Sequence, residues 1–128
     1  MFDWFKKKSA GPNGPDFSGI DSKAKAEARL QSGELEKLLL LPAEFGGTDD
    51  PRNVVYVPRG FVAMKRNIDL NIIKPLVDGG KITEYRAMPE YEGESLVPIA
   101  IKVVASKPGS FTTDINIWGK ALARKTDS

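Results

Sequence analysis

The chain has 128 residues, of which 41% are hydrophobic and 28% charged, with a formal net charge of +2. It contains neither cysteine nor histidine, which excludes disulfides and thiolate sites and removes the commonest general base and metal ligand. No apolar run approaches the roughly 20 residues that span a bilayer, and the N-terminus lacks the apolar core of a signal peptide. We therefore expect one globular domain in the cytoplasm.

The ends of the chain differ in composition from its middle. Residues 9–19 are rich in Gly, Pro, Asn and Ser, and we expect a flexible N-terminal segment over 1–19. A single domain is expected over 20–122 and a C-terminal tail over 123–128. Residues 34–119 carry ten basic and twelve acidic side chains, a net charge of −2, so the positive charge lies in the tails.

Aromatic residues lie beside a lysine cluster at the N-terminus. Such a pattern is typical of weak contact with an anionic membrane surface, and the alternatives are a short docked helix and a frayed chain end. The residues concerned are Phe2, Trp4, Phe5, Lys6, Lys7 and Lys8.

The first regular elements are a helix and a short strand. The helix runs over KAKAEARLQ, and either Asp21 or Ser22 can cap it. The segment GELEKLLLLP, residues 33–42, follows, and its leucine run 38–41 fits either a helix or a buried strand. Residues 53–57, NVVYV, predict a short strand.

Residues 60–79 carry two competing patterns. Apolar residues recur at helical spacing at Phe61, Met64, Ile68, Ile72 and Leu76. A shorter alternation over 68–72 is typical of a strand. The length of the segment and the stop at Gly79-Gly80 favour a helix, which Pro75 is expected to kink or restart.

Three strands are predicted in the second half of the chain, over 81–88, 95–105 and 111–118. We expect an α+β fold: a three-stranded antiparallel meander with a short extra strand, covered by two helices. One face of this sheet is expected to pack on the helix of 60–79.

The central strand is strongly apolar. Val97, Ile99, Ile101 and Val103 alternate along one face, which predicts that Ile101 lies in the core. The other face is also largely apolar, so we expect cover on both faces. Pro98 cannot donate to a ladder and is expected at a free edge or beyond the paired region.

The turn at Pro108-Gly109 leaves two registers for the hairpin. A two-residue loop would oppose apolar and polar side chains on one face. A loop of odd length that holds residues 108–110 pairs Ile101 with Ile117 and Val103 with Ile115, and the need for burial favours it.

Carboxylates and a tyrosine gather in two loops. The candidate binding residues are Asp49, Asp50, Glu90, Tyr91, Glu92 and Glu94. Oxygen ligands of this kind suit hard cations, while a solvated loop rim is the alternative. No spacing forces two carboxylates together, so we predict no catalytic residue, resident metal or cofactor.

Short motifs follow one another in a characteristic order in the middle of the chain. They are Phe45-Gly46-Gly47, Asn53 followed by aliphatic residues and Pro58, a helix ending at Gly80-Lys81, and Tyr91-x-Gly93-x-Ser95-x-x-Pro98. This order, over about residues 45–98, resembles the core of bacterial DNA/RNA non-specific endonuclease toxin domains. The resemblance implies a nuclease-like scaffold in a bacterial protein.

The residues that carry the chemistry of that family differ here. Its catalytic histidine lies just upstream of the FGG motif, where this chain has leucines and Pro42. Its metal-holding asparagine falls near Ala63 or Met64, and Asn67 is off the spacing. The resemblance therefore implies the scaffold without the base that activates water or the ligand that holds the metal.

The leading hypothesis is a non-enzymatic protein that binds another protein, in a setting of toxin competition that the resemblance alone implies. The first alternative is a nucleic-acid-binding module that uses the basic tails, against which the acidic middle argues. The second alternative is a carboxylate- and metal-dependent hydrolase built on the loop acids. The sequence does not predict the oligomeric state.

Overall fold

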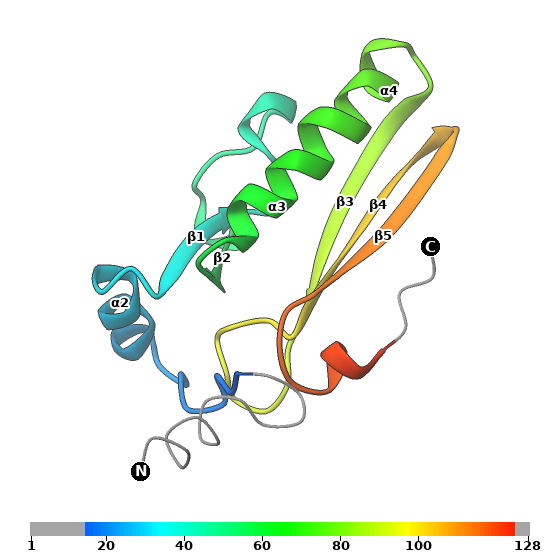
Figure 1. Cartoon of the computed structure of the whole chain (residues 1–128). Helices are drawn as coiled ribbons and strands as arrows, with labels where there is room; N and C mark the ends of the chain where they lie inside the picture. The colour runs from blue at the N-terminus through cyan, green and yellow to red at the C-terminus, as the bar shows by residue number, and fades with distance from the viewer. Residues whose placement is uncertain (1–14, 125–128) are drawn as a thin grey trace.

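A three-stranded antiparallel sheet carries a long helix across one face in the computed structural model, which describes residues 15–124 (Figure 1). The sheet has the order β3-β4-β5, and a second sheet pairs β1 with β2. The strands are β1 (Leu35–Leu39), β2 (Val54–Pro58), β3 (Ile82–Glu90), β4 (Ala100–Pro108) and β5 (Ser110–Asn116). This arrangement confirms the predicted α+β class and its meander. Within the described residues, no helix is long and apolar enough to cross a membrane.

The chain enters the domain through α2 (Lys23–Gln31), which begins at a predicted cap. The Ser22 hydroxyl accepts a hydrogen bond from the Lys25 amide, as an N-cap residue does. The leucine-rich segment that follows is the strand β1 rather than a helix, because β2 supplies a partner for its backbone. Leu38 lies opposite Val55, and both side chains are buried.

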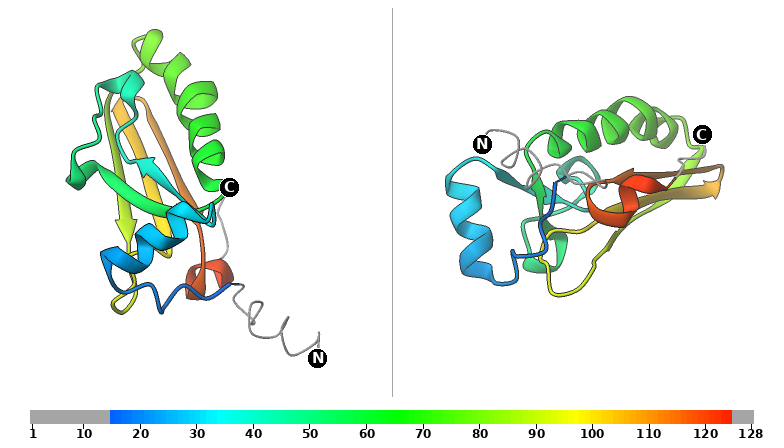
Figure 2. Two further views of the ribbon diagram at one scale, coloured as in Figure 1. Left: turned by 90° about the vertical axis from the view of Figure 1, so that its left-hand side faces the viewer. Right: turned by 60° about the horizontal axis from the view of Figure 1, so that its bottom comes forward.

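One long helix, altered in its middle, crosses the inner face of the three-stranded sheet (Figure 2). It consists of α3 (Phe61–Asn67), a π-helical stretch (Ile68–Ile73) and α4 (Lys74–Asp78). The wider π turns come just before Pro75, whose missing N–H and bulky ring disfavour the α-helical bond to the Asn71 carbonyl. The predicted helix with a disturbance near Pro75 is confirmed.

The loop between β4 and β5 has an odd number of residues, as predicted, but the two strands pair in a different register. Ile101 pairs with Ile115 rather than with Ile117, and Val103 pairs with Thr113 rather than with Ile115. A shift of two residues keeps every side chain on the same face of the sheet. Burial therefore could not separate these two registers from the sequence.

The turn decides the register. The ladder closes with Ser106 opposite Ser110, so the loop consists of residues 107–109 and not of 108–110. Lys107 has a left-handed backbone with φ of 69°, a conformation that few residues other than glycine adopt. The Pro108-Gly109 pair alone did not predict that a lysine takes this left-handed position.

The central strand is shorter than predicted. Residues 95–99 are not part of a strand, and β4 begins at Ala100. Pro98 accordingly lies outside the paired region, as expected. Val97 and Ile99 are nevertheless fully buried, because the chain leading into β4 passes through the core.

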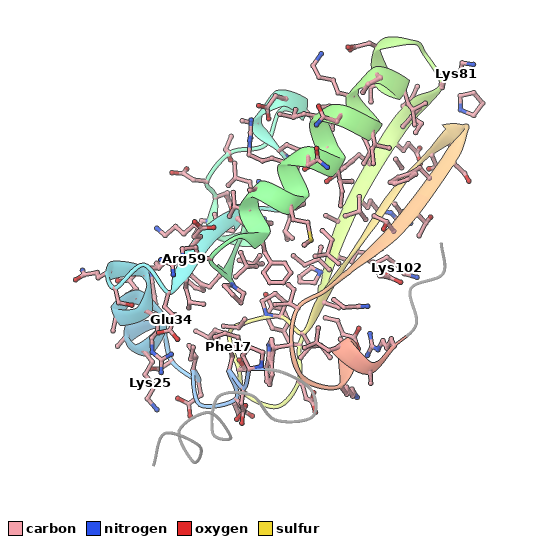
Figure 3. The ribbon with its side chains drawn as sticks, viewed as in Figure 1. Phe17, Lys25, Glu34, Arg59, Lys81 and Lys102 are labelled. Carbon is pink, nitrogen blue, oxygen red and sulfur yellow. The ribbon has the colours of Figure 1, made fainter. Side chains whose placement is uncertain are left out.

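Most of the outer face of the sheet, opposite to the helix, is open to solvent, and the expected cover on both faces is found only at the start of β4, where Ala100 is buried. Lys102 is exposed on β4 (Figure 3), and so are Arg86 and Met88 on β3 and Asp114 on β5. An antiparallel sheet needs only one covered face when its strands alternate in this way.

Phe17 lies in the core, ahead of the predicted domain start at residue 20. Its ring packs edge-on against Trp118 with the centroids 6.0 Å apart, and its carbonyl accepts a hydrogen bond from the Ser95 hydroxyl. The predicted membrane contact through residues 2–8 lies outside the described residues.

Ile101→Asp is expected to unfold the domain, because it places an unpaired charge where the side chain is fully buried. The cost is several kcal/mol, against a total stability of about 5–15 kcal/mol. Urea denaturation followed by circular dichroism measures the free energy of unfolding, with Lys102→Gln on the exposed side of β4 as the control. An Ile101→Asp variant that keeps the wild-type unfolding curve would place Ile101 outside the core.

Candidate functional site

The acidic residues predicted as a binding site do not gather at one point. Glu90 is the last residue of β3 and forms a two-pronged ion pair with Arg124, over 2.8 Å to Nη1 and 2.9 Å to Nη2. This pairing holds the pKa of the Glu90 carboxyl below its ordinary value. Glu90 is thus engaged by the end of its own chain.

Tyr91 and Glu94 border a hollow between β2 and the loop that precedes β4. Its volume is about 390 Å³. We call it the Tyr91 hollow, and its lining residues are Val54, Val55, Tyr56, Tyr91, Gly93, Glu94, Ser95 and Leu96. Tyr91 keeps 47% of its surface exposed, while partial burial raises the pKa of its phenol. The hollow is lined by apolar side chains of β2 and Leu96 together with the polar groups of Tyr91, Glu94 and Ser95.

The base of the Tyr91 hollow is anchored to the core. Ser95 is buried, and its hydroxyl donates to the Phe17 carbonyl over 2.8 Å and accepts from the Val97 amide over 3.1 Å. The Leu96 amide donates to the Ile20 carbonyl. Because both residues are fixed by the first segment of the domain, the loop presents Tyr91 and Glu94 from a firm support.

The remaining predicted residues lie apart from this hollow. The Asp50 carboxylate accepts from the Arg52 amide and guanidinium, which lowers its pKa. Asp49 is exposed, and Glu92 lies beside the Gly119 backbone. Among residues 15–124, no three His, Cys, Asp or Glu side chains come close enough to hold one metal ion.

The FGG motif and Asn53 serve to close a loop onto the end of β1. The Asn53 amide group accepts from the Leu41 N–H over 2.8 Å and donates to the Leu41 carbonyl over 3.0 Å. A side chain at Gly47 would collide with that carbonyl, since a Cβ there would lie 1.7 Å from its oxygen. Phe45 packs edge-on against Tyr85 of β3. Phe45, Gly47 and Asn53 therefore have structural roles in this protein.

A buried polar cluster, which the sequence did not predict, connects the helix to both sheets. Lys65 and Asp69 are each only 2% exposed. The Lys65 ammonium donates to Asp69 Oδ2 over 2.6 Å, to the Tyr85 hydroxyl over 2.8 Å and to the Leu40 carbonyl over 2.9 Å. The Tyr85 hydroxyl in turn donates to Asp69 Oδ1 over 2.7 Å. We call these three side chains the Lys65 cluster.

The hydrogen-bonding groups of the Lys65 cluster are satisfied within the protein. All three ammonium protons of Lys65 have acceptors, so its charge is compensated inside the protein. Burial lowers the pKa of Lys65, against the opposing effect of Asp69, and burial also raises the pKa of Tyr85. An adjoining hollow of about 80 Å³ is small. The arrangement holds elements together and leaves little room for a substrate.

The sequence contained a faint signal for this cluster. Lys65, Asp69 and Ile73 recur every four residues on the buried side of the helix, which places two charges within an otherwise apolar stripe. Tyr85 occupies an inward position of β3. Their meeting depends on how the helix crosses the sheet, and no local pattern predicts that crossing.

Comparison with protein-family models, curated proteins and solved structures found no match to this chain. The resemblance to nuclease toxin domains therefore stays a prediction from short motifs.

Lys65→Met is expected to destabilise the domain by roughly 3–5 kcal/mol, because it leaves the Asp69 carboxylate buried with one hydroxyl as partner. The double variant Lys65→Met/Asp69→Leu is expected to regain most of this loss, since it removes both charges. Urea denaturation of the two single variants and the double variant measures the coupling.

The matched control is Lys74→Met, which breaks a pair of the same spacing with Asp78 on the exposed side of the same helix. Its expected cost is below about 1 kcal/mol. Equal costs for Lys65→Met and Lys74→Met would contradict a structural role for the Lys65 cluster.

Proposed function

We propose that this protein acts by binding another protein through the Tyr91 hollow. The observation that carries the proposal is the exposure of Tyr91, 47%, at the border of an apolar hollow with an anchored base. A tyrosine offers a large contact area and a polar tip, and such residues supply much of the energy of protein interfaces.

The charges at the hollow indicate the chemistry of the partner. Glu94 lines the hollow, and its carboxylate forms no ion pair within residues 15–124. Lys37 lies opposite Tyr56 on β1 but does not line the hollow. A partner segment with an apolar or aromatic side chain next to a lysine or arginine fits this surface.

The Lys65 cluster supports binding over catalysis. Lys65 is buried and its pKa is lowered by that burial. Its ammonium group already donates each of its three protons to an acceptor within the protein. A general base or nucleophile needs a vacant position toward a substrate. The nuclease-like scaffold, the bacterial origin and the cytoplasmic location stay predictions from the sequence.

Selection from a displayed peptide library is expected to enrich sequences in which a basic residue adjoins an aromatic or aliphatic one. Tyr91→Ala is expected to weaken binding of these peptides by roughly tenfold, the loss typical of a central interface residue. Fluorescence polarisation with labelled peptides measures the affinities. The matched control, Met88→Ala, removes another exposed apolar side chain from the outer face of the sheet.

Glu94→Lys is expected to weaken the same peptides, whereas Asp49→Lys, which makes the same charge change away from the hollow, leaves them unaffected. Peptides that bind all four variants equally would place the binding surface elsewhere. Enrichment of no such sequences would contradict the proposed partner chemistry.

The purified protein is expected to leave plasmid DNA and RNA intact in the presence of magnesium, manganese or calcium. Phosphodiester hydrolysis near neutral pH needs a group that activates water and a cation that takes up charge. The chain has no histidine, and its loop acids do not converge. Gel electrophoresis of the digests provides the readout. Metal-dependent cleavage that Glu92→Ala or Asp49→Ala abolishes would establish a hydrolase instead.

A further inference from the structure

The edge of β5 presents unpaired backbone groups. The Ile117 amide donates to the Ile99 carbonyl and the Lys107 amide to the Gly109 carbonyl, which shows that odd-numbered residues of β5 direct their backbone groups toward β4. The alternation of an antiparallel ladder then directs the N–H and C=O groups of Thr112 and Asp114 to the outer edge. No other strand of residues 15–124 pairs with this edge.

This edge has little of the usual protection against pairing, since Asp114 is the one charged side chain of residues 110–116. Residues 110–116 contain no lysine, arginine or proline, the residues with which proteins commonly block an exposed strand. Phe111 and Thr113, on the inner face of β5, are half-buried. Figure 1 shows β5 at the rim of the three-stranded sheet.

One flank of the helix is apolar and only partly covered. The opposite flank faces β1 and β3, since Arg66 forms an ion pair with Glu44 and the neighbouring Phe45 packs on Tyr85. The apolar flank therefore lies on the side of β5. Its residues include Met64, 48% exposed, and Ile72, 41% exposed. An unpaired strand edge and an uncovered apolar helix flank thus lie on one side of the molecule.

We propose that two copies of this chain associate through β5, which pairs with its counterpart antiparallel about a two-fold axis at Thr113. Full overlap of the strands places Thr112 opposite Asp114 of the second copy and Phe111 opposite Ile115. The first pair joins a hydroxyl to a carboxylate on the outer face, and the second is apolar on the inner face. No like charges oppose each other in this register.

The same two-fold axis brings the apolar helix flanks together. Antiparallel pairing keeps the inner faces of both sheets on one side, so both helices lie on the same face of the joined sheet and turn their apolar flanks toward the seam. Met64 and Ile72 of each copy then have apolar neighbours. A second copy is the natural occupant because the surface is complementary to itself in both hydrogen bonding and apolar cover. The interface shares no residue with the Tyr91 hollow and does not depend on its function.

Sedimentation equilibrium of the full chain is expected to show a dimer that dissociates on dilution. Thr112→Pro removes an N–H that points to the edge and leaves the β4 ladder intact. It is expected to raise the dimer dissociation constant by roughly tenfold or more, because symmetry removes the hydrogen bond twice. Thr112→Ala, which keeps the N–H, is the matched control and stays dimeric.

A second pair of variants tests the helix flank without touching the strand. Ile72→Glu is expected to shift the protein to monomer, whereas Ala63→Glu, on an exposed part of α3, leaves the dimer intact. Circular dichroism verifies that each variant is folded. A wild-type protein that stays monomeric at every concentration, or a dimer that both Thr112→Pro and Ile72→Glu leave unchanged, overturns the proposal.

Hydrogen exchange supplies an independent readout. The Thr112 and Asp114 amides are expected to exchange more slowly as the protein concentration rises, because the dimer covers them. The Thr113 amide, which pairs with β4, serves as the internal reference. Exchange of the Thr112 and Asp114 amides that is independent of concentration contradicts pairing through this edge.

Discussion

The ammonium group of Lys65 is the point at which three parts of the fold are held together. Through one side chain, the helix is tied to the end of β1 at Leu40 and to β3 at Tyr85. Asp69, one turn along the helix, supplies the opposing charge. A buried ion pair of this kind adds little net stability, because desolvating two charges offsets their attraction. We infer that the pair instead favours one arrangement of these elements, since any other leaves a buried charge without a partner.

Other features of the fold follow from this constraint. The segment Leu40-Leu41 is held on its other side by Asn53, and Phe45 rests against the ring of Tyr85. The FGG loop, the end of β1 and the helix therefore share one junction. The Tyr91 hollow and the β5 edge lie away from this junction, and they are the two separate surfaces for which we propose contacts with other molecules.

Much of the fold could be predicted from short stretches of sequence, because apolar alternation along a strand and the cap of a helix each depend on a few neighbouring residues. Ser22 caps α2 as predicted, and Ile101 lies in the core. The register of β4 and β5 did not follow, since pairing Ile101 with Ile115 or with Ile117 buries the same faces. The turn conformation at Lys107 decides between the two, and its neighbours in the sequence do not reveal it.

The candidate site was less predictable because it depends on tertiary placement. The sequence grouped Glu90 with Tyr91 and Glu94, but Arg124 from the far end of the chain engages Glu90. Of the predicted residues, only Tyr91 and Glu94 line the hollow, whose other side is formed by β2. Lys65 and Asp69 had the spacing of an ordinary surface pair, as Lys74 and Asp78 have on the same helix. Only the crossing of helix and sheet distinguishes the buried pair from the exposed one.

Heteronuclear NMR of the lysine ammonium groups tests whether Lys65 joins the helix to its neighbours in the interior. We expect a Lys65 signal that exchanges slowly with water at neutral pH, because all three protons are hydrogen-bonded in the interior, and that shows dipolar contacts to the ring of Tyr85. The Lys74 signal is expected to be broadened by rapid exchange. A Lys65 signal that behaves like that of Lys74, without contacts to Tyr85, would contradict the claim that this ammonium group joins the helix to both sheets.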